Sequence, residues 1–164
     1  MSTTTLIPVE QYLRMTEKPY REYREGVLYS KPMPTWYHGA IQAMLAALLH
    51  KLGLQAGSEI AIRISQKKYL IPDVIAARHI QHPYPTEPVL LCCEILSPED
   101  RIGAMFAKCE EYHTWGVPFC WVIDPEKRTA WEYHAAGEPA RVTESLRAGE
   151  FTVNLGELFS ALER

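Results

Sequence analysis

The chain has 164 residues, of which 47% are hydrophobic, and its formal net charge at neutral pH is −3. This length and apolar content fit one domain, residues 1–164, with a single core. The negative net charge argues against an extended nucleic-acid-binding surface, because such surfaces neutralise phosphates with Lys and Arg.

Membrane insertion and zinc binding are both disfavoured. No apolar run approaches the roughly 18 residues that a membrane span needs, and the first residues, MSTTTLIPVEQYL, do not read as an export signal. We therefore expect a soluble, cytoplasmic protein without a membrane partner. The four cysteines form no CxxC pairs, which favours reduced and buried thiols: Cys92, Cys93, Cys109 and Cys120.

The N-terminal third predicts two helices with a hairpin between them. Residues 8–15 are expected to form a short helix, and residues 21–32 an N-terminal β hairpin with Gly26 at or near its turn. From Trp36 to about Leu54, apolar residues recur every three or four positions, as on one face of a helix. Gly53 is expected to end this helix.

The middle and end of the chain predict strands around a second long helix. Residues 59–65 alternate as a strand, 69–77 continue as a second strand in a hairpin with it, and 88–96 form a buried central strand. A helix follows from about 102 to 115, then a strand at 117–124 that completes a core of about 36–125. Residues 126–164 add short antiparallel strands and a last helical turn. This order predicts an α/β (α+β) fold with a mixed sheet flanked by helices.

Two acidic residues interrupt the predicted apolar strands. Glu94 lies inside PVLLCCEIL, where an unpaired ionised carboxylate would be very costly. Asp73 follows Pro72, which donates no ladder hydrogen bond and marks an edge or a bulge. A buried salt bridge, for instance with Arg63 or Arg101, explains either acid alone. Their occurrence in successive strands favours a functional site.

A metal site follows if these two strands are neighbours. Asp73 and Glu94 would then converge on a hard divalent cation, Mg²⁺ or Mn²⁺, which takes oxygen ligands. Lys108 lies on the following helix, at the border of its apolar face, and its ammonium can point back at the acids. There it would orient or deprotonate a water and stabilise phosphate charge; a solvent-facing lysine is the alternative.

Several segments together resemble the Uma-two family of the PD-(D/E)xK nuclease superfamily. They are LIPDV (70–74), CEILSPEDR (93–101), Lys108, Tyr112 and GVPFCWVIDP (116–125), and the likeness extends to EYREGVL, His38 and GEFTVNLGELF. The resemblance runs over most of the chain. It implies a restriction-endonuclease-like core, a central mixed sheet flanked by helices, with added N- and C-terminal β strands.

The resemblance also implies roles for individual residues. Asp73 and Glu94 match the metal-binding acids, but Leu96 stands where the superfamily has its lysine, and that role would pass to Lys108. Glu22, His38 and Tyr112 are implied as groups that line the site. A surface charge on the hairpin and a histidine at a helix start are the alternatives for Glu22 and His38.

These features lead to the hypothesis of a magnesium-dependent endonuclease that hydrolyses phosphodiester bonds in DNA, with Asp73, Glu94 and Lys108 as catalytic residues. A homodimer would allow both strands to be cut. The rival hypothesis is a catalytically inactive nuclease-fold scaffold or DNA-associated interaction module, which the absence of a basic stripe and Leu96 favour. The aromatic residues could stack on bases or pack the core: Trp36, Tyr37, Trp115, Trp121 and Trp131.

Overall fold

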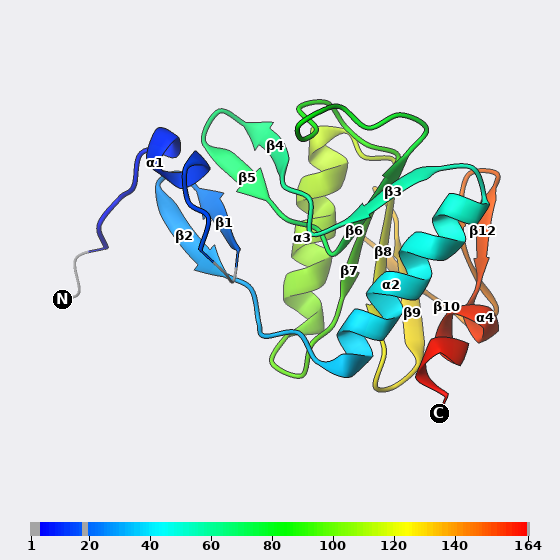
Figure 1. Ribbon diagram of the computed structural model, residues 1–164. Coiled ribbons are helices and arrows are strands. Elements are labelled where there is room, and N and C mark those ends of the chain that lie inside the picture. Colours follow the sequence, from blue (N-terminus) through cyan, green and yellow to red (C-terminus); the bar gives the residue numbers. More distant parts are fainter. Residues whose placement is uncertain (1–3, 18–19, 164) are drawn as a thin grey trace.

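A six-stranded mixed sheet between two long helices organises the computed structural model, which describes residues 4–17 and 20–163 (Figure 1). The strand order is β10-β9-β8-β7-β6-β3, with β7 and β8 parallel and the other neighbouring pairs antiparallel. The strands are β3 (Gln55–Ser58), β6 (Val74–Ala77), β7 (Leu91–Ile95), β8 (Phe119–Asp124), β9 (Thr129–Tyr133) and β10 (Pro139–Val142).

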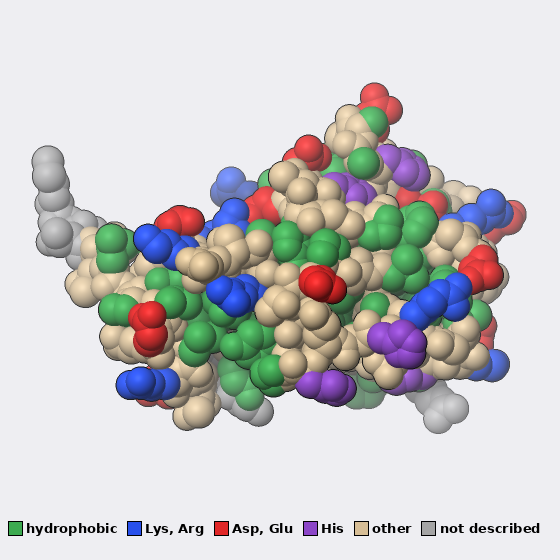
Figure 2. Space-filling view, turned by 90° about the horizontal axis from the view of Figure 1, so that it is seen from above, with side chains coloured by type: hydrophobic (Ala, Val, Ile, Leu, Met, Phe, Trp, Pro, Cys, Tyr) green, Lys and Arg blue, Asp and Glu red, His purple; other side chains and the backbone are tan. Residues whose placement is uncertain are grey.

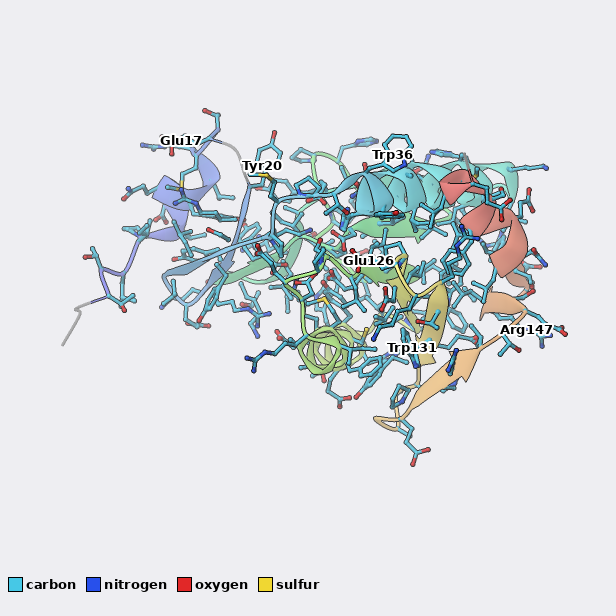
Figure 3. The ribbon with its side chains drawn as sticks, turned by 90° about the horizontal axis from the view of Figure 1, so that it is seen from below. Glu17, Tyr20, Trp36, Glu126, Trp131 and Arg147 are labelled. Atoms are coloured by element: carbon cyan, nitrogen blue, oxygen red, sulfur yellow. The ribbon has the colours of Figure 1, made fainter. Side chains whose placement is uncertain are left out.

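Helices α2 (Trp36–Lys51) and α3 (Ile102–Trp115) cover opposite faces of this sheet, as Figure 3 shows from below. The two cores follow the alternation of the strands: Cys93 of β7 packs with the α2 side, whereas Cys92 packs with the α3 side. The α2 core includes three fully buried helix residues, Ile41, Leu45 and Leu49. The predicted helices and the predicted central strand are therefore confirmed.

A second, four-stranded antiparallel sheet lies beside the first, with the order β2-β1-β5-β4. It combines the predicted hairpin, β1 (Arg21–Arg24) and β2 (Val27–Ser30), with β4 (Ile62–Ser65) and β5 (Lys68–Leu70). Gly26 has a φ of 89° in the hairpin turn, a conformation that glycine adopts without steric cost. The short helix α1 (Val9–Leu13) precedes this sheet.

The C-terminal residues complete both the sheet and its α2 side. Strands β9 and β10 extend the central sheet, while β11 (Ser145–Ala148) and β12 (Phe151–Asn154) form a separate hairpin. Helix α4 (Leu155–Phe159) and a 3₁₀ turn (Ser160–Leu162) then pack against α2. Within the described part of the chain, none of the helices is long and apolar enough to cross a membrane.

The prediction of one strand over 69–77 is wrong, because this stretch forms two strands in two different sheets. β5 ends at Leu70, the chain turns at Ile71–Asp73, and β6 begins at Val74 in the central sheet. Pro72 lies at this turn, where no strand pairing requires the backbone N–H that proline lacks. The strand predicted over 59–65 likewise begins at Ile62, and β3 was not predicted, since QAGS carries no alternating apolar pattern.

Candidate active site

Asp73 immediately precedes β6, and Glu94 lies in the neighbouring strand β7. These strands pair with Val74 opposite Cys93, so continuing the register by one residue sets Asp73 opposite Glu94. Residues opposed in this way have Cβ atoms about 4.5–5.5 Å apart. Asp73 Oδ2 also accepts a hydrogen bond of 2.6 Å from the Ile95 N–H. The strands are adjacent, as expected, and their acids meet although each is 2% exposed.

The turn that carries Asp73 is held by side chains from other elements. The N–H of Ile71 donates to Glu22 Oε2 on β1 at 2.7 Å. The Asp73 carbonyl accepts from Gln42 Nε2 on α2 at 2.9 Å and from the Glu59 N–H at 3.3 Å. The backbone groups between β5 and β6, which have no strand partners, are therefore hydrogen-bonded to other elements, and these bonds also hold Asp73 in position.

Helix α3 supplies the partners of Glu94. The Tyr112 hydroxyl donates to Glu94 Oε1 at 2.5 Å, and Lys108 Nζ lies 3.5 Å from the same oxygen. Lys108 Nζ is closer to Glu22 Oε1, at 2.7 Å. Because Lys108 and Tyr112 are four residues apart, both side chains project from the same face of α3. The helix thus directs its lysine at the acids.

Asp73 has two basic neighbours, Lys31 from the segment that leads into α2 and His38 from the first turn of that helix. Lys31 Nζ, between β2 and α2, lies 2.9 Å from Asp73 Oδ1 and 3.1 Å from Glu59 Oε2. Its third contact is a hydrogen bond of 2.7 Å to the Ile71 carbonyl. His38 Nε2, in the first turn of α2, is 3.2 Å from Asp73 Oδ1. The second acid of the site therefore has a lysine of its own.

Burial and charge shift the ionisation of the two acids in opposite directions. Burial raises the pKa of Glu94 to about 7, an effect that Lys108 opposes and Asp73 reinforces. Burial also disfavours the Asp73 anion, but Lys31 and His38 outweigh it and hold the pKa of Asp73 below its usual range. Burial likewise opposes charge on Lys108, yet the neighbouring carboxylates raise its pKa. Asp73 is therefore ionised at neutral pH, whereas Glu94 exchanges its proton there.

The acids line a cleft of about 1070 Å³ whose walls come from the N-terminal sheet, the start of α2 and one side of α3. Tyr20, Tyr29 and Met33 contribute exposed apolar surface to it. Figure 2 shows one face of the molecule, on which acidic and basic side chains are interspersed without a basic stripe. The cleft joins carboxylates and lysines, an arrangement able to hold a hard cation and a phosphate.

The donor set fits one divalent cation shared by two acids. No group of three or more His, Cys, Asp or Glu that could hold a metal occurs in residues 4–17 and 20–163. Mg²⁺ commonly needs fewer protein ligands than this, since it binds through one or two carboxylates together with waters and substrate phosphates. Lys31 and His38 engage Asp73 Oδ1, the Ile95 N–H engages Oδ2, and the described contacts of Glu94 run through Oε1. Asp73 and Glu94 are therefore the two carboxylates that could share a hydrated ion, with Glu94 Oε2 the oxygen that the described contacts leave open.

One ion-pair and hydrogen-bond network, joined through Lys31 and the Ile71 backbone, contains all six residues predicted for the site: Asp73, Glu94, Lys108, Glu22, His38 and Tyr112. Their chemical roles stay predictions. The alternative partners, Arg63 and Arg101, take no part in the described ion pairs of the two acids. Three further residues of this network were not predicted, because no periodicity or motif marks them: Lys31, Gln42 and Glu59.

The aromatic residues do not form one stacking surface. Trp36, at the start of α2, is 75% exposed, whereas Trp121 is fully buried. Trp131 of β9 packs edge-on against Phe106 of α3, on the other side of the sheet from Trp36 (Figure 3). The interpretation as packing therefore holds for Trp121 and Trp131, while Trp36 is free of the core.

The raised pKa of Glu94 predicts that the metal-free protein loses stability as pH rises. The folded state binds the Glu94 proton more tightly than the unfolded state does, so its stability falls between pH 4.5 and about 7. The full difference is on the order of 3 kcal/mol. Replacing Glu94→Gln removes this contribution and keeps an oxygen for Tyr112. Urea unfolding of both proteins at pH 5, 6, 7 and 8 in the presence of EDTA measures how this contribution changes with pH.

The difference between the unfolding free energies of wild type and variant isolates the contribution of Glu94, because His38, with its own raised pKa, is present in both proteins. The stability of wild type relative to Glu94→Gln should decline over this range and level off above pH 8. A difference that stays constant with pH would contradict the account of Glu94.

Comparison with known proteins agrees with the resemblance seen in the sequence. The profile of the Uma2 family, described as "Putative restriction endonuclease", matches residues 9–163. A crystal structure of "a putative nuclease belonging to DUF820" from Anabaena variabilis ATCC 29413 matches with a TM-score of 0.80 at 22% identity. The match covers 95% of this chain and 99% of that chain. No curated protein gives a significant match.

The structural match confirms the predicted fold class. At this level of identity, a structural likeness shows the fold alone. The family match is independent of it and spans nearly all of the sequence, from α1 to the last turn. The chain belongs to the Uma2 family.

Proposed function

We propose that this protein is a metal-dependent endonuclease that hydrolyses phosphodiester bonds in DNA. The observation that carries the proposal is the meeting of Asp73, Glu94 and Lys108 within one cleft. The family's description, "Putative restriction endonuclease", supports nuclease chemistry and a DNA substrate. Membership by itself assigns neither the metal nor the substrate to this chain.

Asp73 and Glu94 are the residues that would hold Mg²⁺ or Mn²⁺. Such an ion lowers the pKa of a water and stabilises charge on a phosphate. Asp73 is suited to this role because it is already ionised at neutral pH. Tyr112 and the Ile95 N–H fix one oxygen of each acid, so the carboxylates are oriented before a ligand arrives.

Lys108 is the group that would act on the phosphate or on the attacking water. Its ammonium is 3.5 Å from Glu94 Oε1, near enough to reach a phosphate held beside that acid. Glu22, at 2.7 Å, orients it from the opposite wall of the cleft. A fixed positive charge in a buried site stabilises developing phosphate charge more strongly than it would in water.

The assembly and compartment that we propose follow from this chemistry. Cutting both strands of a duplex calls for two active sites, which a symmetric homodimer would supply. Four buried cysteines without disulfide bonds are compatible with the reducing cytoplasm.

A second candidate function, a catalytically inactive scaffold or DNA-associated module, is favoured by one observation. Each acid already has a lysine, Lys31 for Asp73 and Lys108 for Glu94, so the network satisfies its own charges without a metal. A net charge of −3 also gives little general attraction to DNA. Under this alternative, the ion pairs have only a structural role.

Cleavage assays separate the two functions. Supercoiled plasmid and single-stranded DNA are incubated with purified protein and Mg²⁺ or Mn²⁺. The nuclease proposal expects cleavage that EDTA abolishes and that Asp73→Asn or Glu94→Gln lowers about 100-fold or more. Each variant removes one charge while keeping the shape of the side chain.

Glu126→Gln is the matched control, because Glu126 is an exposed acid outside the cleft. It should cleave like wild type. If Asp73→Asn and Glu94→Gln also cleave like wild type, the acid pair is not the active site. If folded wild-type protein cuts neither plasmid nor single-stranded DNA, with Mg²⁺ or with Mn²⁺, the scaffold hypothesis is supported.

Replacing Lys108→Met tests the lysine. Cleavage should fall by about 10²–10⁴-fold, the range for loss of a positioned proton-transfer group, while Mn²⁺ binding measured by calorimetry persists. Lys127→Met, which changes an exposed lysine, is the control and should leave cleavage unchanged. Full cleavage by Lys108→Met would show that the superfamily's lysine has no replacement on α3.

A further inference from the structure

Lys31 is the cation of the site for which the proposed function gives no role. Its Nζ lies 2.7 Å from the Ile71 carbonyl, 2.9 Å from Asp73 Oδ1 and 3.1 Å from Glu59 Oε2. An ammonium has three N–H donors, so these three acceptors satisfy it completely. The side chain is 13% exposed, which means that its charge depends on these oxygens rather than on water.

The three oxygens around Lys31 form the kind of donor set that a hard divalent cation takes. They are two carboxylates and one backbone carbonyl, the ligand types that Mg²⁺ and Mn²⁺ prefer. Glu59 is itself held in place: its Oε1 accepts from Gln42 at 3.0 Å, and its φ of 56° is unfavourable for a residue with a side chain. This arrangement is built from several segments, and at present it holds an ammonium.

We propose that Lys31 is a resident cation that occupies the position beside Asp73 until a divalent metal ion displaces it. The inference rests on the proposed function, because it takes Asp73 to be a metal ligand. An ammonium and a divalent ion on the same carboxylate oxygen repel each other strongly in a buried site. The ion therefore binds Asp73 Oδ1 only as Lys31 withdraws.

The chain around Lys31 allows such a withdrawal. Lys31 directly follows β2 and so begins the segment that runs to α2, whose course Figure 1 shows. Pro32, Met33 and Pro34 of this segment line the cleft. Its long, flexible stem can move the ammonium into a cleft of about 1070 Å³ without unfolding either neighbouring element. Two consequences follow: Lys31 weakens metal binding by competition, and metal binding exposes the Lys31 amine.

Amine labelling of the unmodified protein tests the second consequence. The protein is acetylated with an N-hydroxysuccinimide ester, with and without Mn²⁺, and the modification of each lysine is measured by mass spectrometry. Labelling of Lys31 should be slow without metal and rise several-fold with Mn²⁺, whereas the exposed Lys67 and Lys127 should not change. Lys31 labelling that is unaffected by saturating Mn²⁺ would overturn the proposal.

Calorimetric titration with Mn²⁺ tests the first consequence. Lys31→Met should bind Mn²⁺ about tenfold or more tightly than wild type, because a positive charge beside the ion is removed. Lys127→Met should bind like wild type, and adding Asp73→Asn to Lys31→Met should abolish the gain. Equal or weaker binding by a folded Lys31→Met would instead mean that Lys31 stays and supports the metal-bound site, which contradicts displacement.

These readouts are independent of DNA cleavage, so the two proposals fail in distinguishable ways. Protein that binds Mn²⁺, releases Lys31 and cuts no DNA would refute the nuclease while upholding Lys31 as a resident cation. Protein that cuts DNA with Lys31 still protected in saturating Mn²⁺ would refute the displacement alone. The labelling experiment needs no variant, so it remains decisive if Lys31→Met does not fold.

Discussion

Two carboxylates, Asp73 and Glu94, are buried side by side, and the surrounding structure depends on how their charge is compensated. An ionised carboxylate removed from water is costly unless cations and hydrogen bonds replace the lost hydration. Lys31 and Lys108 approach the pair from separate segments, one for each acid. The compensation is unequal, so one acid is ionised well below neutral pH while the other keeps its proton to about pH 7.

This constraint explains why the N-terminal sheet belongs to the site. The chain crosses from that sheet to the central sheet at Ile71–Asp73, and the crossing places Asp73 next to β7. Glu22 of β1 then binds both the crossing backbone and Lys108 of α3. The N-terminal sheet, the central sheet and α3 are thus joined through the charged groups of one cleft, as well as through their apolar cores.

The sequence predicts those parts of the structure that local patterns encode. The periodicity of α2 and α3 and the apolar run of β7 led to correct expectations. Asp73 and Glu94 are both buried, and β6 and β7 are neighbours, as expected, but the metal site inferred from these acids stays a prediction. The position of Lys108 on the helix after β7 pointed to it before any resemblance did, whereas Glu22 and His38 came from the family resemblance alone. The break at Pro72 was seen as an irregularity but not as a change of sheet. Lys31 was missed because its partner Asp73 is 42 residues away and the contact depends on tertiary packing.

The central proposal is that Asp73 and Glu94 together bind a divalent metal ion. Anomalous diffraction from crystals soaked with Mn²⁺ tests it most directly, because the peak locates the ion without reference to activity. We expect a peak within about 2.0–2.2 Å of an oxygen of each acid, the usual distance for such ions, and its loss in Asp73→Asn. Ordered wild-type crystals with Mn²⁺ peaks elsewhere, and none at this pair, would contradict the claim.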